Sequence, residues 1–169
     1  MTGTGEHRTL ILLRHGKSAY PDGVADHGRP LAPRGDREAA LAGRWIIDHA
    51  GPVDAVLCST ATRTRETLRA AGIQAPTTFA DAVYDATPGE LLAEVDRTDD
   101  TVSVLLVVGH VPGIPGLALT LANEFSDPAT RSSVREHFPT SALAVLDVPG
   151  SWADLGSTGA ALRSLVIPR

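Results

Sequence analysis

The sequence contains a single cysteine, few aromatic residues and no long apolar segment. The lone Cys58 excludes an internal disulfide and agrees with a reducing compartment. Aromatic residues make up only 4% of the chain, so the core must consist of Ala, Val, Leu and Ile, which favours parallel strands covered by helices. No segment approaches the roughly 18 apolar residues of a membrane-spanning helix, and residues 1–8 lack the apolar stretch of a signal peptide. We therefore expect a cytoplasmic protein whose residues 1–8 form a flexible N-terminus.

The charge balance argues against binding to nucleic acid or to a membrane surface. The chain has 169 residues, of which 43% are hydrophobic, and a net charge of -5. These values predict a single acidic domain spanning residues 1–169. Positive charge is nevertheless concentrated in residues 14–69, which contain nine Lys and Arg against seven Asp and Glu. An anion-binding pocket would produce this distribution, and so would exposed helical arginines.

Apolar runs alternate with amphipathic segments along the chain. The expected strands are 10–13, 54–58, 77–79, 102–108, 142–148 and 161–167. The expected helices are 33–50, a segment ending near 71, 87–97 and a segment around 117–121. This alternation predicts an α/β fold, namely a three-layer α/β/α domain with a mostly parallel central sheet. Residues 123–140 have the weakest pattern, and we expect them to form a mobile flap over the functional site.

Three of the expected strands end in polar residues that suit phosphoryl transfer. Arg14 and His15 follow the first strand, Ser59 and Arg63 follow the second, and His110 follows the longest one. Because ligands bind at the carboxyl ends of strands in open α/β sheets, these side chains are expected to converge. Guanidinium groups hold phosphate oxygens in pairs and stay charged, and a neutral imidazole nitrogen can attack phosphorus. The sequence therefore predicts an anion site for phosphoryl chemistry.

Three motifs occur in order along the chain: Leu13-Arg14-His15-Gly16, Ser59-Thr60-Ala61-Thr62-Arg63 and Val108-Gly109-His110. Together they resemble the signatures of the histidine phosphatase superfamily, which includes the phosphoglycerate mutases. Two further segments, Asp26-His27-Gly28-Arg29-Pro30-Leu31 and Phe138-Pro139-Thr140-Ser141-Ala142, resemble the short SixA-type phosphohistidine phosphatases within it. The resemblance implies a phosphoglycerate mutase-like fold and phosphatase activity on phosphohistidine in proteins.

The resemblance also implies a two-step reaction. His15 matches the residue that is phosphorylated, and water then hydrolyses the phosphohistidine intermediate. The residues that match phosphate-binding positions are Arg14, Arg63 and His110. We expect His110 to be cationic during the reaction. The proton donor is open between Asp85, Asp26 and none, because an imidazole leaving group needs less acid catalysis than an alkoxide. The chain departs from the family at Val111, where many relatives have asparagine, and this puts local hydrogen bonding in question.

Other kinds of site have partial signals in the sequence. Gly16-Lys17-Ser18 is similar to the end of a P-loop, but Ile11 stands where that motif needs a glycine. A metal site built from His15, His27 and His110 lacks a close pair of ligands, and we expect neither a metal nor a cofactor. A small-molecule phosphomonoesterase, a mutase and a non-catalytic phospho-ligand binding module stay open as alternatives. The expected partner is a phosphorylated protein or a small phosphorylated metabolite, not nucleic acid or a membrane.

Overall fold

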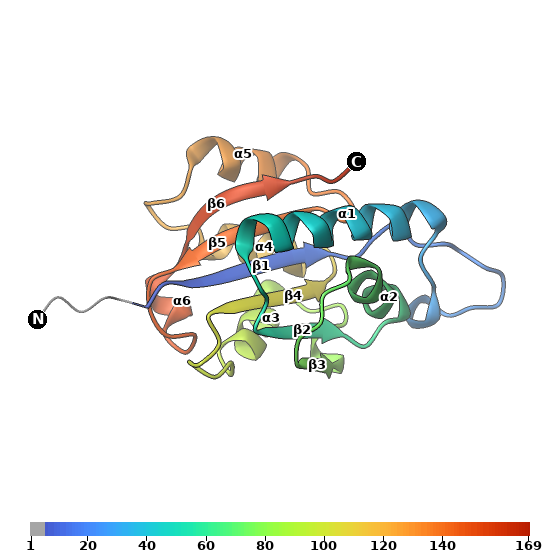
Figure 1. Ribbon diagram of the computed structural model, residues 1–169, viewed down its shortest axis with the longest axis horizontal. Coiled ribbons are helices and arrows are strands. Elements are labelled where there is room, and N and C mark those ends of the chain that lie inside the picture. Colours follow the sequence, from blue (N-terminus) through green and yellow to red (C-terminus); the bar gives the residue numbers. More distant parts are fainter. Residues whose placement is uncertain (1–5) are drawn as a thin grey trace, which may run out of the picture.

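A computed structural model describes residues 6–169, which fold around one sheet of six strands (Figure 1). The strands are β1 Arg8–Arg14, β2 Ala55–Ser59, β3 Thr77–Ala80, β4 Val104–Gly109, β5 Leu143–Val148 and β6 Ala161–Val166. Their order across the sheet is β3-β2-β4-β1-β5-β6. The pairs among β1 to β4 are parallel, whereas β5 pairs antiparallel with both β1 and β6. The mostly parallel central sheet is therefore confirmed.

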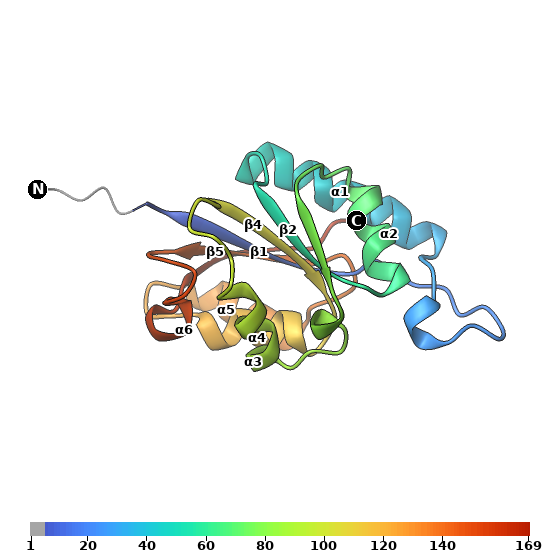
Figure 2. The same cartoon turned by 90° about the horizontal axis from the view of Figure 1, so that it is seen from below.

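Helices cover both faces of this sheet (Figure 2). They are α1 Pro33–Ala50, α2 Thr62–Ala71, α3 Pro88–Val95, α4 Gly113–Leu121, α5 Pro128–Glu136 and α6 Leu155–Thr158, with 3₁₀ turns η1 Asp26–Gly28 and η2 Asp81–Val83. Helices α1 and α2 lie on one face, and α3, α4 and α5 lie on the other. The predicted three-layer arrangement is confirmed. No helix in the described part of the chain has both the length and the apolar character needed to cross a membrane.

The four aliphatic residues of β1 divide between the two layers of core. Leu10 and Leu12 are fully buried in the cluster that includes α3 and α4, whereas Ile11 and Leu13 are fully buried in the cluster that includes α1 and α2. Successive side chains of a strand point to opposite faces, so a strand covered on both sides needs apolar residues at every position. The polar residues that follow β1 are therefore attached to a rigid, fully buried strand.

Local sequence signals account for several element boundaries. The capping box at the start of α3 is present: the hydroxyl of Thr87 accepts from the backbone N–H of Glu90 at 3.2 Å, and the Glu90 carboxylate accepts from the N–H of Thr87 at 2.8 Å. Cys58 is fully buried in β2, as expected for a small core residue. Helix α3 ends at Val95, two residues before the predicted end at Arg97.

Residues 123–140, which were expected to form a mobile flap, contain a regular helix. This segment contains α5, which begins after Asp127, and the Asp127 carboxylate caps the helix by accepting from the backbone N–H of Thr130 at 2.8 Å. Val134 is the buried residue of this helix. A helix with such a narrow apolar stripe has little of the periodicity from which helices are predicted, so the sequence pattern hid it.

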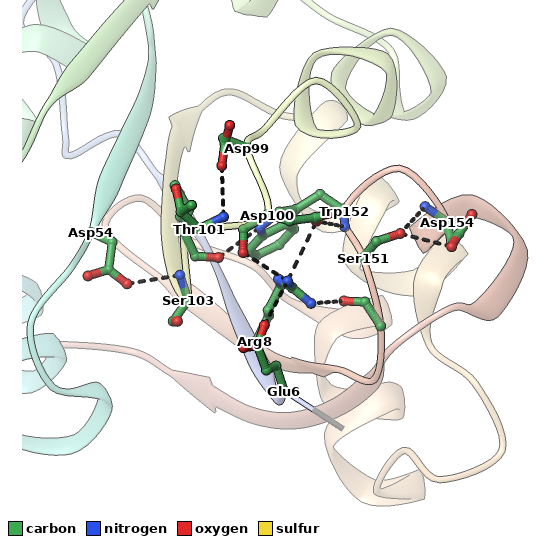
Figure 3. Close-up of polar contacts among 12 residues, drawn as sticks. Glu6, Arg8, Asp54, Asp99, Asp100, Thr101, Ser103, Ser151, Trp152 and Asp154 are labelled. Carbon is green, nitrogen blue, oxygen red and sulfur yellow. Dashed lines mark hydrogen bonds and ion pairs between the residues drawn. The ribbon is translucent and has the colours of Figure 1, made fainter. Parts of the chain in front are cut away.

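The expectation of a flexible N-terminus is wrong at Arg8. Residues 1–5 lie outside the described residues, but Arg8 is the first residue of β1 and is 7% exposed. Its guanidinium donates to the backbone oxygens of Gly150 and Asp100, both at 2.8 Å (Figure 3). The Asp100 carboxylate in turn accepts from the backbone N–H of Trp152 at 3.2 Å. These bonds anchor the start of β1, at the end of the strand opposite to the predicted site.

Candidate active site

The register of the sheet brings the two predicted histidines together. In the parallel pair of β1 and β4, Arg14 lies opposite Gly109, and the backbone N–H of His15 donates to the Gly109 oxygen at 3.0 Å. His110 is the next residue after that glycine. The ring centroids of His15 and His110 are accordingly 5.2 Å apart, and both side chains are buried. The two residues are far apart in the sequence but adjacent at the carboxyl edge of the sheet.

Hydrogen bonding determines the tautomer of His15. Its Nδ1 lies 2.7 Å from the carbonyl oxygen of Gly16. A carbonyl oxygen only accepts, so Nδ1 carries the proton and the lone pair of the neutral ring is on Nε2. Burial, followed by the charges of Arg63 and Arg14, lowers the pKa of His15 from 6.5 to about 4, although the Gly16 bond opposes this change. At neutral pH the ring is uncharged, and Nε2 has the electron pair that a nucleophile needs.

The loop after His15 is tied to α2. The N–H of Gly16 donates to the hydroxyl of Thr67 at 2.9 Å, and that hydroxyl donates to the backbone oxygen of Arg63 at 2.6 Å. A side chain at Gly16 would place its Cβ 2.8 Å from the backbone oxygen of Gly35, so only glycine fits without a shift. These contacts couple the position of His15 to that of Arg63.

His110 is held by the serine that ends β2. Its Nε2 lies 2.8 Å from the hydroxyl of Ser59, and its Nδ1 is buried with no hydrogen-bond partner among residues 6–169. Burial lowers the pKa of His110 from 6.5 to about 3, and repulsion from the protonated form of His15 and from Arg63 acts in the same direction. His110 is therefore neutral at neutral pH in this structure, unlike the cation expected during the reaction. A bound anion would favour its protonated form.

Two arginines border the paired histidines. Arg63, in the first turn of α2, is 4% exposed and donates to the backbone oxygen of Asp26 at 2.8 Å and to its carboxylate at 3.1 Å. Arg14 ends β1 and donates to the backbone oxygen of Phe138 at 2.9 Å. In the described part of the chain, the Nε atoms of Arg14 and Arg63 are buried without a partner. Such N–H groups beside two neutral imidazoles suit a tetrahedral oxyanion.

The two candidate proton donors lie in different surroundings. Asp26 accepts from the hydroxyl of Tyr84 at 2.5 Å and pairs with Arg63. The Tyr84 bond is the main cause that lowers the pKa of Asp26 from 3.8 to about 2, so this carboxyl is ionised and has no proton to donate at neutral pH. Asp85 is exposed at a turn residue with a φ of 53°. Neither aspartate is set as a general acid in this structure.

Tyr84 belongs to this site although the motifs did not indicate it. Its ring lies 5.5 Å from that of His110, at an interplanar angle of 81°, and its hydroxyl binds Asp26. Tyr84 follows β3 and the turn η2. The other site residues were predicted because they follow strand ends, and the same criterion could have identified Tyr84.

The structure also locates two other residues from the sequence arguments, His27 and Val111. His27 does not join a metal site: its Nε2 lies 2.9 Å from the hydroxyl of Thr60, and no group of three His, Cys, Asp or Glu side chains within residues 6–169 is arranged to hold a metal ion. Val111 is 45% exposed. The backbone N–H of Ile114 donates to the oxygen of His110 at 2.9 Å, so the turn beside Val111 keeps its backbone bond.

Comparison with known proteins agrees with this geometry. A family model described as the histidine phosphatase superfamily, branch 1, matches residues 10–97. An uncharacterized protein of Mycobacterium tuberculosis is 53% identical over 158 residues, which cover 93% of this chain and 100% of that protein. The chain belongs to the histidine phosphatase superfamily. The segment that matches the family model contains Arg14, His15 and Arg63, whereas His110 lies beyond it.

This superfamily member is also similar to SixA proteins. A solved structure from Nakamurella multipartitia, provisionally assigned as the phosphohistidine phosphatase SixA, is 41% identical with a TM-score of 0.89 and covers 96% of each chain. Phosphohistidine phosphatase SixA of Escherichia coli is 28% identical over 151 residues, which cover 84% of this chain and 88% of that protein. A phosphoglycerate mutase from Plasmodium falciparum is 14% identical with a TM-score of 0.64 and covers 96% of this chain and 93% of its own. That last likeness shows the phosphoglycerate mutase-like fold and nothing more.

Proposed function

We propose that this protein is a phosphohistidine phosphatase that works through a phosphohistidine intermediate on His15. The observation that supports the proposal most strongly is the state of His15. Its imidazole is buried and neutral, with Nδ1 engaged by the Gly16 oxygen and the lone pair on Nε2. The ring lies beside that of His110, and the positive charges of Arg63 and Arg14 lower its pKa. A nucleophile that faces cationic donors is suited to phosphoryl transfer.

The proposed reaction has two displacements at phosphorus. Nε2 of His15 attacks, so that a P–N bond forms and the bond between phosphorus and the leaving group breaks. Arg14 and Arg63 offset the charge on the equatorial oxygens in each transition state. The N–H of Nδ1 stays bonded to Gly16 and stabilises the positive charge that the ring gains in the intermediate. Water then attacks in line, the P–N bond breaks, and inorganic phosphate leaves.

The absence of a ready proton donor favours phosphohistidine as the substrate. Asp26 is ionised and Asp85 is an exposed turn residue. An alkoxide leaving group depends on a general acid, whereas an imidazole is expelled more readily without one. The similarity to SixA of Escherichia coli supports the same substrate class.

The substrate class is tested by comparing a phosphohistidine peptide with small sugar phosphates. We expect kcat/KM for the peptide to be at least about 100-fold higher, which corresponds to about 2.7 kcal/mol of transition-state binding. A preference of that size for a sugar phosphate would contradict the proposal and identify a small-molecule phosphomonoesterase. Conversion of 3-phosphoglycerate to 2-phosphoglycerate with a bisphosphoglycerate primer would identify a mutase.

The His15→Ala variant tests the intermediate. We expect hydrolysis of p-nitrophenyl phosphate to fall by about a thousandfold or more, because the attacking atom is gone. Wild-type protein quenched in alkaline denaturant should carry a base-stable, acid-labile phosphoryl group that the variant lacks. Equal rates in the two proteins would remove His15 from the mechanism. Phosphate binding by the wild type with no turnover of any phosphorylated compound would indicate a binding module instead.

A further inference from the structure

We propose that Arg29 is a third phosphoryl-binding arginine of this site, positioned by Asp26 and Tyr20. Arg29 lies in the irregular loop between β1 and α1, just after the turn η1. The inference rests on phosphoryl transfer at His15 but does not depend on which phosphorylated compound is the substrate.

One carboxylate connects Arg29 to the predicted site. Oδ2 of Asp26 accepts from Nη2 of Arg63 at 3.1 Å, and Oδ1 accepts from Nε of Arg29 at 3.2 Å. The hydroxyl of Tyr84 donates to Oδ2 as well, and the carboxyl is ionised. Asp26 therefore holds two guanidinium groups on its two oxygens. This arrangement places Arg29 directly beside an arginine that borders the paired histidines.

The guanidinium of Arg29 is mostly buried, and one of its nitrogen donors has no acceptor within residues 6–169. Its side chain is 13% exposed, and its central carbon lies 4.0 Å from the centroid of the Tyr20 ring, which is 74% exposed and covers the cation from outside. Nη1 of Arg29 is buried and has no hydrogen-bond partner in residues 6–169. A buried donor without an acceptor costs free energy, so native structures rarely keep one. An oxyanion bound at the site supplies the acceptor.

The charge of Arg29 also reaches the predicted nucleophile. After Arg63 and Arg14, it is the third guanidinium whose charge lowers the pKa of His15. Coulomb interactions weaken with distance, so a cation that acts on the His15 ring also acts on a phosphoryl group attached to that ring. A transferring phosphoryl group spreads charge over three equatorial oxygens. Nη1 of Arg29 provides a further donor for these oxygens, beside those of Arg14 and Arg63.

Binding of inorganic phosphate, followed through the imidazole NMR signals of His15 and His110, tests this inference without any turnover. We expect the Kd for phosphate to rise about 10- to 100-fold in Arg29→Gln, because a charge-assisted hydrogen bond is lost. Arg34→Gln is the matched control: this nearby arginine pairs with Glu38 at 2.8 Å and is 53% exposed, so its loss should leave the Kd within twofold. An Arg29→Gln protein that binds phosphate within twofold of the wild type would overturn the inference.

Two further readouts separate a direct contact from support of the loop. Arg29→Gln should raise the pKa of His15, whereas Arg29→Lys should keep it low because the charge remains. Arg29→Lys lacks the planar fork and should still bind phosphate about threefold or more weakly, which keeps the test decisive if Arg29→Gln does not fold. Suppose that Arg29→Lys and Arg29→Gln both fold and leave the Kd for phosphate and the pKa of His15 unchanged. Arg29 would then have only a structural role, through its ion pair with Asp26. A wild type that binds phosphate through Arg29 but hydrolyses nothing would contradict the proposed function alone.

Discussion

Acidification from pH 7.5 to pH 5 is expected to destabilise the protein because two buried histidines resist protonation. Burial is the main cause that lowers the pKa of His15 to about 4 and that of His110 to about 3, from 6.5. Both rings take up a proton near their ordinary pKa in the unfolded chain. Between that value and the folded pKa values, the unfolded state binds more protons than the folded state. The contribution of the two histidines to the free energy of unfolding is therefore fully present above pH 6.5. It is lost as the pH falls toward the folded pKa values.

The magnitude follows from the size of the pKa changes. At pH 5 the unfolded histidines are almost fully protonated, whereas the folded rings are almost fully neutral. Linkage then gives about 2 kcal/mol of destabilisation for each histidine relative to pH 7.5. Because His15 and His110 interact, the total for the pair lies between about 2 and 4 kcal/mol. This is a large share of the roughly 5–15 kcal/mol by which folded proteins are stable.

Urea unfolding in phosphate-free buffer, at several pH values between 7.5 and 5, measures this loss. Phosphate is left out because ligand binding would add its own stabilisation. His110→Ala should reduce the pH dependence of the unfolding free energy by about 2 kcal/mol. The control is His137→Ala, which changes an exposed histidine after α5. It should leave the pH dependence of the unfolding free energy unchanged. A wild-type change of less than about 0.5 kcal/mol, or an undiminished pH dependence in His15→Ala/His110→Ala, would refute the reasoning.

Three further predictions concern the pKa of His15, the bond between Tyr84 and Asp26, and the packing of Gly43 against α2. The specific activity of folded protein should persist from pH 7.5 down to pH 5.5, because His15 stays neutral well below 6.5; a fall centred near 6.5 would contradict its lowered pKa. Tyr84→Phe removes the main cause of the low pKa of Asp26, so NMR titration of that carboxyl should show a higher pKa, and an unchanged value would assign the effect to Arg63. Gly43→Ala would drive a Cβ into the backbone oxygen of Ala71, the last residue of α2, and should lower the unfolding free energy by about 2 kcal/mol or more. Gly89→Ala meets nothing within 4 Å and is its control in the same urea assay.

The convergence of the site was predictable because it depends on a few strong signals. Unbroken aliphatic runs marked β1 and β4, and parallel strands that share an edge bring their carboxyl ends together. The adjacency of His15 and His110 follows from the pairing of those two strands alone. The path of the loop between β1 and α1 has no periodicity, so the contact between Asp26 and Arg63 could not be predicted from the sequence. The antiparallel pairing of β5 and the presence of α5 had equally weak local signals.

Protonation states were the least predictable part of the site. The resemblance to the histidine phosphatases led to the expectation that His110 is cationic during the reaction. The pKa of such a residue depends on burial and on the summed charge around it, and neither quantity can be read from a motif. Burial and the cations that border His15 and His110 act in the same direction, so the rings are neutral.

In the proposed mechanism the same cations act on the two histidines at different stages. Before a phosphoryl group binds, Arg63 and Arg14 help to keep His15 unprotonated, which preserves the lone pair that attacks phosphorus. A bound phosphoryl dianion opposes those charges, so the pKa of His110 rises and its buried Nδ1 or Nε2 gains a proton. His110 thus becomes cationic only when an anion is present to be stabilised. A neutral ring in this structure and a cationic ring during the reaction are therefore two states of one site, connected by the charge of its substrate.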